Sequence, residues 1–156
     1  MAGREHIYAA TLDWTGASAG PVRDYKTYSR DFSATIAGKP LLTGSADPTY
    51  LGDAKQHNPE DLLLISLAAC HMLSYLALCA RDKIVVTAYR DEATGTMAIA
   101  DGKMRFVSVT LHPQVVIADA AKLERARALH EEAHAACFIA NSVNFPVGNE
   151  ANIAVA

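Results

Sequence analysis

The sequence has few of the features that would place it in a specialised class of protein. Its 156 residues include three cysteines and one tryptophan, and its formal net charge is −3. An odd number of cysteines argues against a disulfide scaffold in an oxidising compartment. With no basic patch, the chain shows no sign of binding nucleic acid. We therefore expect a cytoplasmic protein that has no nucleic-acid partner.

Signals for targeting, repetition or division into domains are also missing. The N-terminal residues Met-Ala-Gly-Arg-Glu-His lack the apolar core of a signal peptide. We find no repeat at solenoid periods, no low-complexity segment and no linker. The length of the chain is close to the common size of one domain. We expect residues 1–156 to form a single domain.

The longest run without an acidic or basic residue covers residues 62–80, and it follows a clear helix start. Asn58 is a favoured capping residue, and Pro59 suits the first helical position because its missing N–H would be unpaired there. Two acidic residues then lie near the positive end of the helix dipole. This pattern predicts a helix over Pro59–Arg81.

The same uncharged run is long enough to span a membrane. However, serines, a histidine and many alanines dilute its apolarity, and amphipathic strands elsewhere in the chain need a core to cover. A helix that is apolar on all sides is then a central core helix. We therefore expect no membrane partner. Burial of the whole helix would be easiest if a second subunit covered one face, which favours a homodimer.

Alternating apolar residues on both sides of this helix predict β-strands. Before the helix we expect strands over residues 8–14 and 32–36, followed by a loop over 43–57. After it we expect an antiparallel meander of strands over residues 84–90, 93–99 and 103–117. Asp101-Gly102 is a hairpin turn signal. Pro113 interrupts the last strand and indicates a bulge or a sheet edge at that point.

A second helix is predicted over residues 120–136, with Asp119 as its cap. A turn-rich segment over residues 141–148 and a short closing strand over residues 151–155 follow. The predicted fold class is therefore α+β. It consists of antiparallel sheets packed on a long central helix, with a second helix near the C-terminus.

Two of the three cysteines stand close to ionisable residues, which suggests thiol chemistry. Cys70 directly precedes His71, and Cys137 follows His134 by three positions. The alternative is a zinc site, because His130, His134 and Cys137 have the spacing of one helical face and His71 adds a possible ligand. The sequence lacks the paired cysteine motifs of structural zinc sites. We expect no metal and no other cofactor.

The order of three motifs resembles the OsmC/Ohr family, which is named for osmotic induction and organic hydroperoxide resistance. The motifs are Asn58-Pro59-Glu60-Asp61-Leu62, Ala68-Ala69-Cys70 and Ala133-His134-Ala135-Ala136-Cys137. The resemblance covers most of the chain. It implies an intertwined homodimer with two active sites at its interface. It also implies a thiol peroxidase in which Cys70 is the peroxidatic cysteine and Cys137 the resolving cysteine.

These residue types suit that chemistry. A thiolate attacks a peroxide oxygen and becomes a sulfenic acid. A second thiol then condenses with the sulfenic acid to form a disulfide. Cys79 is a poor partner for Cys70, because nine residues along a helix place it about 13.5 Å away and on the opposite face. We expect Cys79 to be a small apolar core residue.

The thiolate also needs a cation, and the resemblance implies an arginine in the N-terminal β region that pairs with Glu60. Arg30 is our choice, Arg23 competes for the role, and either could instead be a solvated turn residue. Glu60 lies about 15 Å along the helix from Cys70, so it cannot reach that sulfur within its own helix. We expect Glu60 to act across the dimer. Otherwise it is a first-turn residue that the helix dipole favours.

Two departures from the organic-hydroperoxide branch indicate a less characterised branch of the family. Phe138-Ile139-Ala140 follows the second cysteine in place of a Pro-Tyr-Ser type sequence, and His71 follows the first cysteine. The sequence therefore does not identify the peroxide substrate or the reductant. We expect the reductant to be a dithiol, which in the organic-hydroperoxide branch is a lipoyl-bearing protein. A third alternative is a dimer that binds a small apolar ligand and has structural cysteines.

Overall fold

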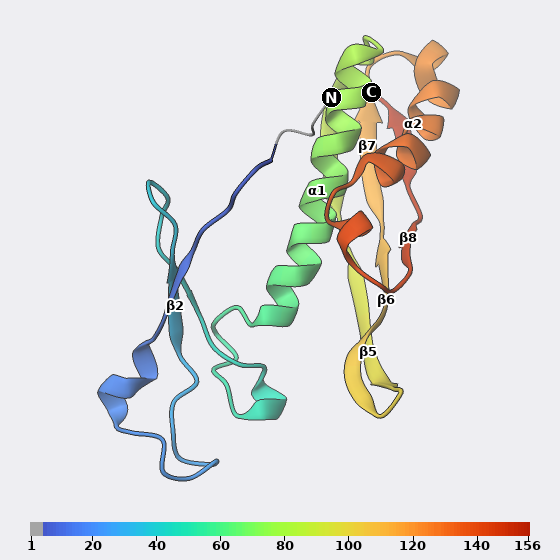
Figure 1. Ribbon diagram of the computed structural model, residues 1–156. Coiled ribbons are helices and arrows are strands. Elements are labelled where there is room, and N and C mark those ends of the chain that lie inside the picture. Colours follow the sequence, from blue (N-terminus) through green and yellow to red (C-terminus); the bar gives the residue numbers. More distant parts are fainter. Residues whose placement is uncertain (1–4) are drawn as a thin grey trace. The chain divides into compact units, whose positions relative to one another are not determined.

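The computed structural model describes residues 5–156 (Figure 1), which fall into two compact units. The first unit ends at Leu62 and the second covers Leu63–Ala156. The expectation of a single domain stays a prediction. Residues 1–4, part of the segment inspected for a signal peptide, lie outside the described residues.

The first unit contains a three-stranded antiparallel sheet with the order β1-β2-β3. The strands are β1 (Thr11–Trp14), β2 (Phe32–Thr35) and β3 (Leu42–Gly44), and two short 3₁₀ helices follow β1 and β3 at Thr15–Ala19 and Pro48–Tyr50. The first two strands are shorter than predicted. The loop predicted from residue 43 is wrong at its start, because Thr43 and Gly44 pair with Ser33 and Phe32. A three-residue strand is too short to show an alternating pattern.

The first unit leaves many of its large apolar side chains exposed. Both clusters of buried apolar residues found in the described chain belong to the second unit. In the first unit, Ile7 and Tyr8 are about nine-tenths exposed, and Leu12, Tyr25 and Leu41 are each more than half exposed. The described part of the first unit therefore has no apolar core of its own.

The long helix α1 (Pro59–Arg81) begins and ends at the predicted residues. Asn58 Oδ1 accepts a hydrogen bond from the Asp61 N–H at 2.7 Å, and Asp61 Oδ2 accepts one from the Asn58 N–H at 3.2 Å. This reciprocal pair is a capping box in which aspartate takes the usual place of glutamate. It satisfies two backbone donors around the helix start, where no carbonyl of a preceding turn is available.

The strands of the second unit form two mixed sheets and not the predicted meander. One has the order β4-β7-β9 and the other β5-β6-β8. Their bounds are β4 (Val86–Asp91), β5 (Thr94–Ala100), β6 (Lys103–Leu111), β7 (Pro113–Ile117), β8 (Val147–Asn149) and β9 (Asn152–Val155). Only the β5-β6 hairpin matches the prediction, with Asp101 and Gly102 at positive φ in its turn. The two C-terminal strands pair in parallel with β6 and β7.

The run predicted as one strand over residues 103–117 divides at His112. Pro113 has no N–H to donate, and it is the first residue of β7, a position where a sheet tolerates proline. The His112 N–H instead donates to Asp91 Oδ1 at 2.8 Å. The prediction of a bulge or an edge at Pro113 is wrong, because β7 is the central strand of its sheet and β6 belongs to the other one.

The second helix, α2 (Leu123–Ala136), is preceded by a 3₁₀ turn over Ala120–Lys122. Asp119 Oδ1 caps this turn by accepting the Ala121 N–H at 2.9 Å, so the predicted helix over residues 120–136 is confirmed with a 3₁₀ first turn. A further 3₁₀ turn covers Ala140–Ser142.

In the second unit, α1 buries one stripe of residues against protein and leaves its opposite side open. Leu67, His71, Tyr75 and Cys79 are spaced four residues apart and are fully buried, whereas Leu73 is 63% exposed. Figure 1 shows α1 alongside β7, and Tyr75 joins one apolar cluster with residues of β7 and α2. By length and composition alone, α1 is long and apolar enough to cross a membrane. The core helix of a soluble protein can have the same length and apolarity.

Candidate functional site

The structure brings Cys70 and Cys137 together within the second unit. Cys70 lies in the middle of α1 and is half-buried, and Cys137 is the C-terminal cap of α2 and only 1% exposed. Both are free thiols, and they lie close together, since the turn after Cys137 donates adjacent N–H groups to both sulfurs. Two neighbouring thiols on different helices can form a disulfide by local movement alone.

The turn after Cys137 directs backbone N–H groups at both sulfurs. The Ile139 N–H donates to Cys70 Sγ at 3.5 Å, and the Ala140 N–H donates to Cys137 Sγ at 3.4 Å. Donors of this kind favour the charged form of a thiol. The sequence did not reveal this contribution, because a backbone N–H is supplied by almost any residue type.

The two thiols differ in their surroundings. Burial, followed by the hydrogen bond with Cys70, raises the pKa of Cys137 to about 11. Cys137 is therefore protonated at neutral pH and is shielded from solvent. Cys70 is the one of the two that lines an open groove, so it is the thiol that a molecule from solution meets first.

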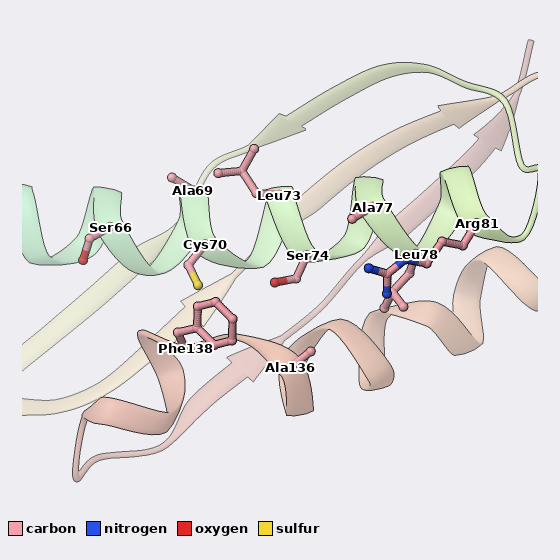
Figure 2. A pocket seen from close by; sticks show the side chains of 10 residues that line it. All are labelled: Ser66, Ala69, Cys70, Leu73, Ser74, Ala77, Leu78, Arg81, Ala136 and Phe138. Carbon is pink, nitrogen blue, oxygen red and sulfur yellow. The ribbon is translucent and has the colours of Figure 1, made fainter. Parts of the chain in front are cut away.

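The groove has a volume of about 580 Å³ and follows the open side of α1. Figure 2 shows the Cys70 sulfur directed toward Phe138, with Ser74 one turn further along the helix. The wall is mostly apolar and has one arginine, at the end of α1. Its lining residues are Ser66, Ala69, Cys70, Leu73, Ser74, Ala77, Leu78, Arg81, Ala136 and Phe138.

Cys79 is a core residue, as predicted. It is 1% exposed and belongs to the apolar cluster that α1 forms with α2 and the sheet around β7. Burial raises the pKa of its thiol. Cys79 is therefore separate from the cysteine pair.

Arg30, the predicted cation, lies in the first unit and is held by two tyrosines. Its guanidinium donates hydrogen bonds to the carbonyls of Tyr28 and Tyr25. It also lies over the ring of Tyr28, 3.8 Å from the ring centre, and 5.1 Å from that of Tyr25. Arg30 Nε is buried without a partner among the described residues. Arg23 is exposed, so Arg30 is the more constrained of the two candidates.

Glu60 lies in the first turn of α1, within the first unit. Its Oε2 atom is buried and has no hydrogen-bond partner in the described part of the chain. Among residues 5–156, the ion pairs found include none between Arg30 and Glu60. The structure thus unites the two cysteines but does not pair the two charged residues. Their place beside Cys70 stays a prediction.

The histidines suggested for a zinc site are arranged differently. His130 faces His71, with 3.0 Å between His130 Nδ1 and His71 Nε2. Desolvation by burial lowers the pKa of both side chains to about 4, with a further contribution from a neighbouring histidine, so both are neutral at pH 7. Within residues 5–156 no group of three His, Cys, Asp or Glu side chains has the arrangement of a metal site.

The sequence and the fold are similar to those of known proteins. Residues 52–149 match the family model described as OsmC-like protein. The structure of an OsmC-like protein of unknown function from Vibrio cholerae O1 biovar eltor is 30% identical and has a TM-score of 0.87, and the match covers 95% of this chain and 100% of that one. No curated protein matches the sequence.

Two more distant structures have the same fold. An organic hydroperoxide resistance protein from Elizabethkingia anophelis is 18% identical, with a TM-score of 0.67, and the match covers 98% of this chain and 100% of that one. One from Legionella pneumophila is 17% identical, with a TM-score of 0.64 and coverage of 97% and 99%. The predicted α+β fold and the resemblance to the family are confirmed.

The different surroundings of the three thiols predict their order of alkylation. In the reduced protein, iodoacetamide at pH 8 should label Cys70 and leave Cys79 and Cys137 unlabelled, because the last two are buried and have raised pKa values. Labelling of Cys137 in a Cys70→Ser variant should increase as the pH approaches 11. Peptide mapping by mass spectrometry measures both. Rapid labelling of Cys137 at pH 8 would contradict the assignment.

Proposed function

The chain belongs to the OsmC-like protein family, and we propose that it is a cysteine-based peroxidase that reduces hydroperoxides in cytoplasmic defence against oxidative stress. The observation that carries the proposal is the pairing of a groove-lining thiol, Cys70, with a buried thiol, Cys137, beneath a turn that supplies N–H donors to both. A structural cysteine pair would need no access to a groove.

In the first step, the Cys70 thiolate attacks the outer oxygen of a hydroperoxide. The O–O bond breaks, Cys70 becomes sulfenic acid, and the remaining alkoxide takes up a proton and leaves as an alcohol. In the second step, the Cys137 thiol attacks the oxidised sulfur of Cys70. An S–S bond forms, and the hydroxyl group of the sulfenic acid leaves with the thiol proton as water. A dithiol then reduces the disulfide by exchange and regenerates both thiols.

The lining of the groove supports an organic hydroperoxide as the substrate. Leu73 and Phe138 expose 63% and 81% of their surface, and both line the groove that contains Cys70. Burial of an alkyl or aryl group against them would be favourable, at roughly 25 cal/mol for each Å² of apolar surface removed from water. Hydrogen peroxide offers no such group. A small dithiol, such as a lipoyl group on a carrier protein, would also fit an open groove.

We assign to Arg30 the role of the cation that stabilises the Cys70 thiolate, with Glu60 as its partner. The tyrosines that hold Arg30 limit its motion, and its unpartnered Nε leaves one donor available. The unpartnered carboxylate oxygen of Glu60 offers the matching acceptor. Since the two do not pair within the described chain, the proposal places their contact across a dimer interface.

Two uncovered surfaces support an intertwined homodimer. The first unit exposes large apolar side chains and has no apolar cluster among its described residues, and α1 has an open face that includes Leu73. Large exposed apolar patches on a folded protein mark surfaces that bind another molecule. A second copy of the chain would cover the first unit and close the groove along α1 from outside, so that Leu73 would line a pocket between the two chains, and it would bring its Glu60 to the Arg30 of the first copy.

The central experiment is consumption of cumene hydroperoxide by the reduced protein. One equivalent should convert two thiols per chain into a Cys70–Cys137 disulfide that dithiothreitol reverses. Cys70→Ser should abolish consumption, whereas Cys137→Ser should allow one turnover and leave Cys70 as sulfenic acid. Cys79→Ser is the matched control and should behave as wild type. A wild-type protein that consumes no hydroperoxide would reject the peroxidase proposal in favour of a binding protein, and consumption that persists in Cys70→Ser would remove Cys70 from the reaction.

The homodimer should be visible in sedimentation velocity at micromolar concentration. Leu73→Glu places a charge on the open face of α1, and burial of an unpaired carboxylate is costly, so this variant should sediment as a monomer. Val85→Glu is a suitable control, because Val85 has a similar exposure of 61% but lies outside α1. A wild-type chain that sediments as a stable folded monomer would contradict the dimer.

Arg30→Met should raise the pKa of the Cys70 thiol and slow peroxide reduction by about tenfold or more, since one pKa unit corresponds to about 1.4 kcal/mol. Arg30→Lys should recover only part of the rate, because an ammonium group cannot reproduce the guanidinium fork. Arg23→Met serves as the control and should have little effect. The measurement is the pH dependence of Cys70 alkylation and of peroxide turnover. If the profiles of Arg30→Met match those of wild type, Arg30 has no role in the site.

A further inference from the structure

A buried polar network joins the elements that carry the two cysteines. His71 on α1 is 1% exposed and His130 on α2 is 4% exposed, and their facing nitrogens are 3.0 Å apart. Asn149, the last residue of β8, places its Nδ2 atom 2.9 Å from His71 Nε2. Three side chains from three elements therefore meet at one point, with the two imidazoles buried and Asn149 half-buried.

The two imidazoles form a straight hydrogen bond. Their planes are 9° apart, and their ring centres are separated by 5.4 Å. This separation equals the 3.0 Å between the facing nitrogens plus the distance from each nitrogen to its own ring centre, so the nitrogens lie on the line that joins the two centres. The rings therefore lie edge to edge, with one N–H between them. This geometry leaves no room for a metal ion between the two nitrogens.

Asn149 adds a third nitrogen to the contact between the imidazoles. Its Nδ2 atom lies 2.9 Å from His71 Nε2 and 3.4 Å from His130 Nδ1, so its NH₂ group can donate to whichever imidazole nitrogen carries no proton. Tyr75 stacks on the His130 ring with 3.9 Å between ring centres and fixes the plane of that ring. The three nitrogens therefore lie within hydrogen-bond distance of one another, and the plane of one imidazole is fixed.

Each member of the network is linked to the cysteine pair through the chain. His71 is adjacent to Cys70, and His130 precedes Cys137 by seven residues, which is two helical turns. Asn149 ends the segment that starts at Cys137 and includes Ile139, whose N–H donates to Cys70 Sγ. A movement of α2 along α1 would thus change the imidazole contact and the sulfur contact together.

We propose that the His71–His130–Asn149 network holds α2 in register on α1, so that Cys137 is placed to attack oxidised Cys70. These residues are positioning residues for the second, resolving step and do not touch the peroxide. The proposal rests on the proposed function for the source of the oxidised Cys70.

The physical reason is the difference between polar and apolar contacts. A shift of about 1.5 Å, the rise of one helical residue, stretches or bends a straight hydrogen bond and leaves buried nitrogens unpaired. The apolar contacts around it, such as those of Leu129, tolerate the same shift more easily because the hydrophobic effect is not directional. A disulfide forms only when the distance and the orientation between the two cysteine side chains lie within narrow limits. The network supplies the directional constraint that the apolar core lacks.

The test uses 2,2′-dithiodipyridine, which oxidises thiols without a peroxide. The Cys70 thiolate attacks the probe, forms a mixed disulfide and releases one thiopyridone. The Cys137 thiol then attacks the Cys70 sulfur, and its proton leaves with the second thiopyridone as the Cys70–Cys137 disulfide forms. Stopped-flow absorbance resolves the two releases, and peptide mapping identifies the sulfurs.

His130→Leu removes the imidazole bond and leaves an apolar side chain in its place. The first release should keep the wild-type rate, whereas the second should slow by about tenfold, as the loss of a buried hydrogen bond suggests. His130→Gln keeps an amide donor and should recover part of the second rate. Leu129→Val disturbs the same helix without touching the network and should leave both rates unchanged. Thermal unfolding followed by circular dichroism verifies that each variant is folded.

Asn149→Ala provides a second test if His130→Leu does not fold, and it should also slow only the second release. A folded His130→Leu or Asn149→Ala variant with a wild-type second rate would overturn the inference, as would a wild-type protein that releases no second thiopyridone. The proposed function is tested separately by cumene hydroperoxide. If the hydroperoxide leaves Cys70 reduced while the probe gives the expected pattern, the peroxidase proposal fails and the positioning role stands.

Discussion

The packing of α2 on α1 is the interaction on which the candidate site depends. Cys70 lies in the middle of one helix and Cys137 at the end of the other, so their contact exists only when the helices lie in this register. The turn after α2 then supplies N–H donors to both sulfurs. Without the helix packing, the two thiols would be 67 residues apart in a flexible chain, and no backbone donor would be aimed at either.

The same packing explains why the two thiols have different chemistry. The end of α2 is buried against α1, which keeps Cys137 protonated, while the open side of α1 leaves Cys70 on the groove. A peroxidase cycle needs one accessible nucleophile and one protected thiol that reacts only after the first has been oxidised. The difference thus arises from burial, and not from the identity of the residues, which is the same at both positions.

The helices and the site sulfurs were predictable because their signals are local. A capping residue, a proline at the first helical position and a long uncharged run are enough to define α1, and the ordered motifs around Cys70 and Cys137 indicated the family. The sheets were predicted less well. Pairing between β6 and β8, or between β7 and β9, joins segments about 38 residues apart, and the three residues of β8 show no alternation. Pro113 indicated a break, but the tertiary structure alone showed that the break separates two sheets.

By itself, the sequence determined where α1 begins and ends, that the chain has an α+β fold, and which two cysteines carry family motifs. Each of these depends on interactions between residues close in the chain or on the order of a few motifs. The tertiary structure alone decided that His130 pairs with His71 and not with His134 and Cys137. Helical spacing allows both arrangements, but only the packing of α1 beside α2 brings a second buried imidazole within hydrogen-bond distance. Contacts between distant segments depend on how whole elements pack, and no local pattern encodes that.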